Sequence, residues 1–345
     1  MQTEFYDQLR CKLRLKKRFN EGGKDMKRFK ALLVTAVTAG IALGIAACGA
    51  PTKEASSSGE SGDKVVIGAT YYTLQTEFCT RMDNAAKKWA EENDVDYTSY
   101  DGDNDAAKQL EQVETMIAQG VDAIILNPQD ADACAACVDA ADKAGIPVIG
   151  VNTMVNSDKL TSYVGSQDVG AGEEIMQYMI DHMGRKDFKI VVIEGPMGQS
   201  AQLQRWEGIT NVLADNPDIE ILAYDTANWS RSEAQTIMET WLNAYGNEIE
   251  AVIAENDEMA LGARVAIDEA GLDIPCIGID GITDAVTAVK DGKMIASDFQ
   301  DAEGQIQGAL EMAVKASQGK EVEKEVWIPF QMITPENYKE YENRY

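Results

Sequence analysis

The stretch AVIAENDEMALGA, residues 251–263, places three acidic side chains close together: Glu255, Asp257 and Glu258. Carboxylates at this spacing could act as a general acid and base or hold a cation. They could instead follow a buried strand and begin a helix, where negative charge is favourable. The second interpretation is preferred, so we expect Glu255 and Glu258 to be solvated and Asp257 to cap the helix. Asn256, at the carboxyl end of the strand, is then the residue expected to contact a ligand.

The common catalytic, nucleotide-binding and metal-binding motifs are missing from the sequence. His182 is the only histidine and lies on the polar face of a predicted helix, which leaves little basis for a Ser-His-Asp or Cys-His arrangement. No GxGxxG follows the first apolar run, and GxxxxGK[ST] and HExxH do not occur. DGDND at 101–105 departs from calcium-loop spacing and is interpreted as a turn. We therefore expect no enzymatic activity, no bound metal and no cofactor.

The six cysteines are too dispersed for a disulfide scaffold. Cys134 and Cys137 form CAAC in a helical pattern, which could be a redox or metal pair. A second CxxC and a nearby histidine are missing, so small residues that pack a helix are the preferred interpretation. Cys79 and Cys276 are isolated in the sequence.

The N-terminal region has the pattern of an export signal. Residues 26–47 begin with basic residues, continue as an uncharged apolar run and lead to Cys48. The small residues before Cys48 favour a lipoprotein signal over a single membrane anchor, although the run is nearly long enough to span. Residues 48–63 read as a flexible Ser/Gly-rich tether, and residues 1–25 as a non-native extension. We expect an exported chain, lipidated at Cys48 and held on the outer face of the bacterial cytoplasmic membrane.

The charge of the chain excludes several partners. It carries 31 basic and 58 acidic residues, a formal net charge of −27. Many of the basic residues lie before Cys48, so the exported part is more acidic still. Such a surface repels phosphate backbones, which excludes nucleic acid, and it does not suit a basic face on an anionic membrane.

From Lys64 onward, short apolar runs alternate with helical stretches. The runs are continuous rather than alternating, which is typical of parallel strands covered on both faces. Repeated strand–helix units predict an α/β fold with doubly wound parallel sheets. The length favours two such sheets, divided near residues 166–168.

Ligands of such sheets bind beyond the carboxyl ends of the strands, so the residues that follow each apolar run are the candidates. Most carry amide or hydroxyl groups, with a few carboxylates: Tyr72, Thr73, Asp101, Asn127, Asn152, Ser166, Glu194, Asp225, Asn256 and Asp280. This set suits the hydroxyl groups of a sugar or polyol, and Phe78 and Trp229 could supply flat faces for a ring. Any single member could also be an ordinary helix cap or turn residue.

Several stretches, taken together and in order, resemble one family. AENDEMALGA, IGIDGITDAVTAVKDGKMIAS, IILNPQDADA, AGIPVIGVNT and PFQMITPENY are similar to ribose-binding proteins, the type I periplasmic sugar-binding proteins of ABC importers. The resemblance implies two Rossmann-like lobes, each a doubly wound parallel sheet, joined by three hinge strands. It places residues 64–166 and 301–327 in an N-terminal lobe, and 167–300 and 328–345 in a C-terminal lobe.

The same resemblance implies a set of ligand-binding residues. Phe78 and Trp229 would stack on the sugar, Arg205 would direct its planar fork at sugar oxygens, and the remaining members would bind hydroxyl groups: Asn127, Asn152, Asn256, Asp280 and Gln300. Further positions near the expected cleft are Tyr72, Thr76, Cys79, Thr153 and Ser166.

Three departures from the family pattern bear on the ligand. The segment after the first strand reads Thr76-Glu77-Phe78-Cys79, Asn152-Thr153 stands where Asp-Arg is usual, and Ile279 replaces an aromatic residue before Asp280. Loss of a charged hydrogen-bonding pair changes which hydroxyl pattern a closed site accepts. Ribose is therefore in question, and another pentose, a hexose or a polyol is equally compatible.

Three functions are compatible with these features. The preferred one is a monomeric, lipid-anchored receptor that captures a monosaccharide or polyol between its lobes and delivers it to an ABC permease and its ATPase subunit. The second is a sensor subunit that presents a sugar or autoinducer to a chemoreceptor or sensor kinase. An exported sugar-acting enzyme ranks third, because the usual catalytic motifs are missing.

Overall fold

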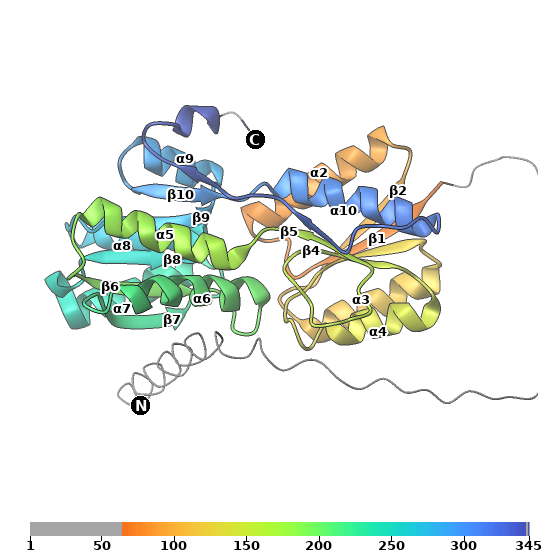
Figure 1. Cartoon of the computed structure of the whole chain (residues 1–345), viewed down its shortest axis with the longest axis horizontal. Coiled ribbons are helices and arrows are strands. Elements are labelled where there is room, and N and C mark those ends of the chain that lie inside the picture. Colours follow the sequence, from red (N-terminus) through yellow and green to blue (C-terminus); the bar gives the residue numbers. More distant parts are fainter. Residues whose placement is uncertain (1–63, 343, 345) are drawn as a thin grey trace, which may run out of the picture. The chain divides into compact units, whose positions relative to one another are not determined.

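The computed structural model describes residues 64–342 and 344, which form two α/β lobes (Figure 1). The predictions for residues 1–25, 26–47 and 48–63, with lipidation of Cys48, lie outside the described residues. Within the described part of the chain, no helix is long and apolar enough to cross a membrane.

The first lobe, here called the N-lobe, is built on a sheet of order β11-β5-β4-β3-β1-β2 in which every neighbouring pair is parallel. Strands β3, β4 and β5 are buried along their whole length, as expected for continuous apolar runs covered on both faces. The strands are β1 (Val66–Tyr71), β2 (Asp96–Asp101), β3 (Ala123–Asn127), β4 (Val148–Asn152), β5 (Ser162–Gly165) and β11 (Glu325–Trp327).

The second lobe, the C-lobe, has a sheet of order β12-β10-β9-β8-β6-β7. Its pairs are parallel except at one edge, where β12 runs antiparallel to β10. The sequence predicted parallel strands alone; β12 differs because the chain enters it directly from β11 of the other lobe and not through a strand–helix–strand unit. The strands are β6 (Lys189–Glu194), β7 (Glu220–Thr226), β8 (Ala251–Ala254), β9 (Cys276–Asp280), β10 (Ala296–Phe299) and β12 (Gln331–Ile333).

Helices cover both sheets, and local signals set their ends. Asp105 accepts hydrogen bonds at the start of α3, and Ser230 does so at the start of α7. Gly120 and Gly145 end α3 and α4 in the left-handed conformation, at φ 75° and 74°. The N-lobe carries α2 (Glu77–Glu92), α3 (Ala106–Gln119), α4 (Ala135–Ala144) and α10 (Ala302–Ser317); the C-lobe carries α5 (Asp168–Met183), α6 (Ser200–Asp215), α7 (Arg231–Tyr245), α8 (Asp257–Glu269), α9 (Thr283–Lys290) and the short turns η1 (Gly246–Glu248) and η2 (Tyr338–Glu340).

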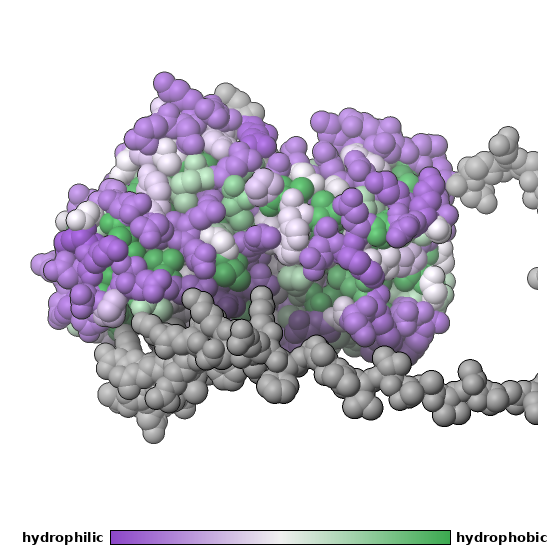
Figure 2. All heavy atoms as spheres, in the orientation of Figure 1, coloured by the Kyte–Doolittle hydropathy of each residue, from purple (hydrophilic) through white to green (hydrophobic). Residues whose placement is uncertain are grey.

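Over the described residues the chain passes between the lobes after β5, after β10 and after β11 (Figure 1). Helix α10 packs on β3, β4, β5 and α2, so the segment after β10 returns to the N-lobe. The predicted fold class, two Rossmann-like lobes joined by three connections, is confirmed. Hydrophilic residues cover much of the face drawn in Figure 2, in keeping with the strong negative charge of the chain.

Candidate functional site

A cavity with about 370 Å³ of empty space lies where the strands of both lobes end. Five of its lining residues come from the N-lobe or its helix α2, and the rest come from the C-lobe and the connection after β10. They are Tyr72, Thr76, Phe78, Asn152, Thr153, Gln199, Ala201, Arg205, Trp229, Asn256, Glu258, Asp280 and Gln300.

Two aromatic rings face this cavity from opposite lobes. Phe78 projects from α2 and is 6% exposed, and Trp229 follows β7 and is 4% exposed. Trp229 and the preceding Asn228 both have positive φ, 60° and 52°, a strained backbone of the kind that is retained at functional sites. The indole Nε1 of Trp229 donates a 2.6 Å hydrogen bond to Oε1 of Gln199, which fixes the plane of the ring. The cavity therefore offers two rigid apolar faces.

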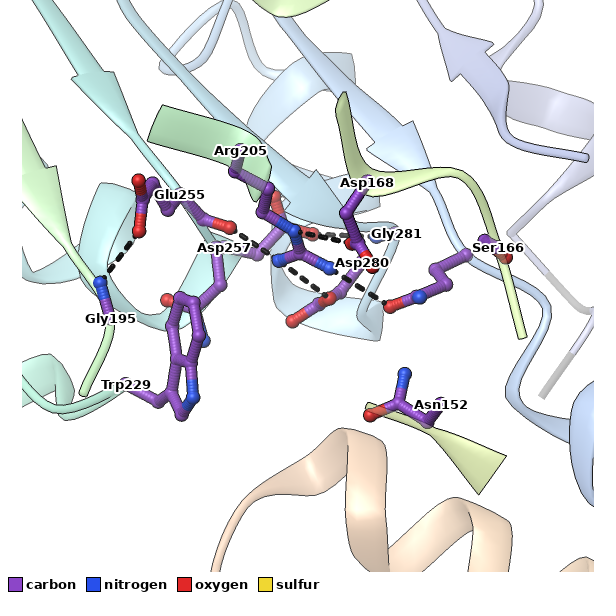
Figure 3. Close-up of polar contacts among 12 residues, drawn as sticks. Asn152, Ser166, Asp168, Gly195, Arg205, Trp229, Glu255, Asp257, Asp280 and Gly281 are labelled. Atoms are coloured by element: carbon purple, nitrogen blue, oxygen red, sulfur yellow. Dashed lines mark hydrogen bonds and ion pairs between the residues drawn. The ribbon is translucent and has the colours of Figure 1, made fainter. Parts of the chain in front are cut away.

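Arg205 on α6 is the central polar residue of the C-lobe wall, and it is 3% exposed. Its Nε donates to Asp168 at 2.9 Å, and its two terminal nitrogens donate to the Glu255 carbonyl at 2.5 Å and to Oε1 of Gln300 at 3.2 Å. The guanidinium also lies 4.0 Å from a carboxylate oxygen of Asp280 (Figure 3). Because every part of the fork is held, Arg205 is oriented before a ligand arrives.

Asp280 ends β9 and is held in an unusual conformation, at φ 125° and 5% exposed. Burial raises its pKa well above the ordinary value, opposed by the nearby charge of Arg205. The loop that follows is anchored from below by Asp257, whose carboxylate accepts hydrogen bonds from Gly281 N at 2.7 Å and Ile282 N at 3.1 Å. Ser297 on β10 donates to the same carboxylate at 2.8 Å. These contacts keep Asp280 pointed at the cavity in spite of the strain.

The N-lobe wall is uncharged, in contrast to the C-lobe wall. Asn152 ends β4 at φ 64°, and its Nδ2 donates to Oε1 of Gln305 at 3.2 Å. Tyr72 and Thr76 add polar side chains to this wall, and Thr153 lines it while its hydroxyl donates to the Pro128 carbonyl at 2.8 Å. Such a surface forms hydrogen bonds with hydroxyl groups without requiring charge on the ligand.

Three of the positions implied by the resemblance lie outside the cavity lining, and so do four strand-end candidates, Thr73, Asp101, Glu194 and Asp225. Asn127 is completely buried, and its Nδ2 donates to Thr153 at 2.9 Å and to the Val151 carbonyl at 3.1 Å, so it supports the wall from behind. Cys79 is buried with its Sγ 3.9 Å from Asn127, and Ser166 accepts a 2.7 Å hydrogen bond from Gln305. A place after a strand does not determine which way the side chain points, and these three point into their own lobe.

Three expectations for the acidic stretch 255–258 are wrong. Glu255, predicted to be solvated, is completely buried and accepts a 2.8 Å hydrogen bond from Gly195 N. The helix cap is Asn256 and not Asp257: the Asn256 side chain accepts from Met259 N at 2.9 Å and also lines the cavity. Glu258, also predicted to be solvated, has a side chain that is only 17% exposed, and its carboxylate pairs with Arg231 at 2.6 Å.

Gln199, Ala201 and Glu258 line the cavity although sequence reasoning did not include them as candidates. Gln199 is the N-cap residue of α6, separated from β6 by four residues. Residues that begin the helix after a strand face the same edge of the sheet as those that end the strand. Extending the search from strand ends to helix starts would have found all three.

Two buried carboxyl groups make stability depend on pH. Burial raises the pKa of Glu194 to about 7 and that of Asp257 to about 7. In an unfolded chain the pKa of either group is about 4. Between these values the folded protein holds protons that the unfolded chain has lost. The associated stability is fully present below about pH 4 and is lost as the pH rises through about 7.

We therefore expect the melting temperature to fall by several degrees between pH 5.5 and pH 8, measured by calorimetry at fixed ionic strength. Glu194→Gln can keep the contact with Gln202, which lies 2.7 Å away, and should flatten part of this dependence. A melting temperature that rises over this interval would contradict the assignment.

Metal and thiol chemistry have little support in the described part of the chain. Among residues 64–342 and 344, no group of three or more His, Cys, Asp or Glu side chains is placed to hold a metal ion. Cys134 and Cys137 are buried and form no disulfide bond, and Sγ of Cys134 lies 3.3 Å from Oε1 of Gln109. The preferred interpretation of CAAC, small residues at a packed helix start, is compatible with this environment.

The sequence of this chain is similar to those of known binding proteins. A model of the periplasmic binding protein domain matches residues 67–321. The chain is 38% identical to a xylitol-binding protein of Mycolicibacterium smegmatis, over 88% of this chain and 85% of that protein. It is 39% identical to a putative rhizopine-binding protein of Rhizobium meliloti, over 81% and 93% of the two chains.

A solved structure shows a similar arrangement. An ABC transporter solute-binding protein from Bacillus halodurans with bound myo-inositol superposes with a TM-score of 0.79 at 38% identity, covering 84% of this chain and all of that one. The likeness therefore extends over both lobes.

Proposed function

The chain belongs to the periplasmic binding protein family, and we propose that it captures a cyclic polyol or a monosaccharide in its ring form and delivers it to an ABC importer. One observation carries the proposal: Phe78 and Trp229 face one cavity from opposite lobes, beside the oriented fork of Arg205. Two flat apolar faces suit the two faces of a six-membered ring. Arg205, Asp280 and the amides then bind the hydroxyl groups at its edge.

The uncharged N-lobe wall supports a neutral ligand. Asn152 and Thr153 line the cavity where a charged pair would be usual in ribose binders, which puts ribose itself in question. Ile279 is completely buried in the C-lobe core and does not line the cavity. One relative is named for xylitol and another has bound myo-inositol, which favours a polyol. The rings of Phe78 and Trp229 favour a cyclic polyol over a linear one.

A thermal-shift screen of the full chain tests the proposal. The panel contains myo-inositol, xylitol, D-ribose, a hexose, an amino acid and a dipeptide. Because a ligand that binds only the folded state stabilises it by mass action, myo-inositol should raise the melting temperature most. A shift produced by the amino acid or the dipeptide, with none from any polyol or sugar, would refute the proposed class of ligand.

Export and lipid anchoring complete the proposal. The apolar run that leads to Cys48 supports a mature chain that begins at Cys48, acylated and held on the outer face of the cytoplasmic membrane, where it would meet a permease with its ATPase subunit. A chemoreceptor or sensor kinase would use the same closed lobes. Mass spectrometry of the mature N terminus tests the anchor, since an unmodified Cys48 would rule it out.

A further inference from the structure

Glu77, the first residue of α2, connects the two lobes although it does not line the cavity. Its Oε1 accepts a hydrogen bond from Thr283 N at 3.1 Å and another from the Thr283 hydroxyl at 2.9 Å. Arg81, one turn further along α2, donates to the same Oε1 at 2.6 Å and to the Thr283 hydroxyl at 3.2 Å. We call these three residues the latch.

The partner of Glu77 is the start of a helix that lacks a cap of its own. Thr283 begins α9, and the N-cap position holds Ile282, whose side chain makes no capping hydrogen bond. A helix start offers free N–H groups and a partial positive charge, which a carboxylate satisfies. Glu77 therefore caps α9 of the C-lobe from the N-lobe.

These contacts exist only while the lobes are together. Separation of the lobes would break both Glu77–Thr283 hydrogen bonds and the Arg81–Thr283 bond, and it would return the Thr283 N–H to water. The other side of the cavity is joined by the hydrogen bond from Met154 N to the Ser200 hydroxyl, at 2.6 Å. The apparent affinity of a closing protein depends on the fraction that is closed, so such contacts change affinity without touching the ligand.

We infer that Glu77 is a positioning residue that holds the loaded protein closed, through its cap on α9, and so sets how long the ligand stays bound. The inference rests on the proposed function. Within one lobe, Glu77 also forms an i, i+4 ion pair with Arg81, which would stabilise α2 equally in open and closed forms. The latch predicts instead an effect confined to ligand release.

The test measures association and dissociation rates by stopped flow on the full chain, with the panel compound that gives the largest thermal shift. Glu77→Ala should raise the dissociation rate about tenfold and Thr283→Val about threefold, because a charge-assisted contact is lost in the first and only the hydroxyl in the second. Association rates should stay within about twofold, since the lobes are open when the ligand enters. Glu92→Gln, exposed at the far end of the same helix, should bind like the unaltered protein.

The double variant, Glu77→Ala with Thr283→Val, distinguishes a latch between the lobes from a contact that only stabilises α2. If Glu77 acts through Thr283, the rate increase in the double variant stays well below the product of the two single effects, because only the Arg81–Thr283 hydrogen bond is left for the second change to remove. Independent effects would multiply. Multiplying effects, an unchanged dissociation rate in Glu77→Ala, or an equal loss of thermal stability with and without ligand would each overturn the inference. If the unaltered protein binds none of the panel compounds, the proposed function is refuted. The inference about Glu77 then fails with it, because the latch acts on a bound ligand.

Discussion

Replacing Arg205 by lysine should lower the affinity for the polyol or sugar at least about 100-fold while the protein stays folded. Lysine keeps the positive charge beside Asp168 and Asp280 but loses the fork that reaches the Glu255 carbonyl and Gln300. Each hydrogen bond from a charged group is worth about 1.5–3 kcal/mol, and losing the two that the oriented fork would donate to ligand hydroxyl groups accounts for a factor of this size. Isothermal titration calorimetry with the compound identified by the thermal screen measures it.

The alanine variant would be a poorer test of the same residue. Asp168 is 1% exposed and its carboxylate pairs with Arg205 at 2.9 Å, so Arg205→Ala leaves a buried acid without its counter-ion. Breaking a buried pair in this way costs about 3–5 kcal/mol of stability, which confuses loss of binding with loss of folding. The lysine variant separates the two.

Arg264→Lys is the matched control. Arg264 is also a buried arginine of the C-lobe, 7% exposed, but it donates to the Leu272 and Ile274 carbonyls away from the cavity. The Arg264→Lys variant should lose some stability and keep its affinity for the ligand. Unchanged affinity in Arg205→Lys, or an equal loss in Arg264→Lys, would mean that the ligand does not bind at Arg205.

Strand ends and resemblance were enough to predict the fold and many residues that line the cavity. Continuous apolar runs separated by helical stretches specify parallel α/β units, and the structure has these units from β1 to β10. Arg205, Trp229 and Asp280, named from motif matches, all line one cavity. Trp229 and Asp280 also lie at the boundaries of regular elements, where a local pattern can find them, whereas Arg205 lies within α6 and was found by the motif match alone.

Contacts between distant segments could not be predicted in the same way. Asp257 looks like a helix cap in its own segment, but its carboxylate is taken up by Gly281 and Ser297, 24 and 40 residues away. Glu255 looks solvated, but it accepts from Gly195 N in a neighbouring strand–helix connection. In both cases the partner comes from the sheet order, which adjacent residues do not encode.

Removal of the Trp229 ring should have the second largest effect. Trp229→Ala should weaken binding about 30-fold, because loss of one stacking face costs about 2 kcal/mol. Trp229→Phe keeps an apolar face but loses the hydrogen bond to Gln199. Its affinity should fall between that of the unaltered protein and that of Trp229→Ala. Trp206→Ala is the control: Trp206 is half-buried on the same lobe, packs on Tyr224 at 5.2 Å and does not line the cavity.

Gly195→Ala provides an independent test of the same ring without altering it. A Cβ atom at Gly195 would lie 2.1 Å from the Trp229 indole, far inside contact distance, so the ring must move. Strain at Asn228 and Trp229, with φ of 52° and 60°, leaves the loop little freedom to absorb that shift. Gly195→Ala should therefore weaken binding nearly as much as Trp229→Ala, and the double variant should be no worse than either, since both remove one stacking face. Affinity equal to that of the unaltered protein in Gly195→Ala would show that the position of the indole does not matter, and stacking on Trp229 would have to be abandoned.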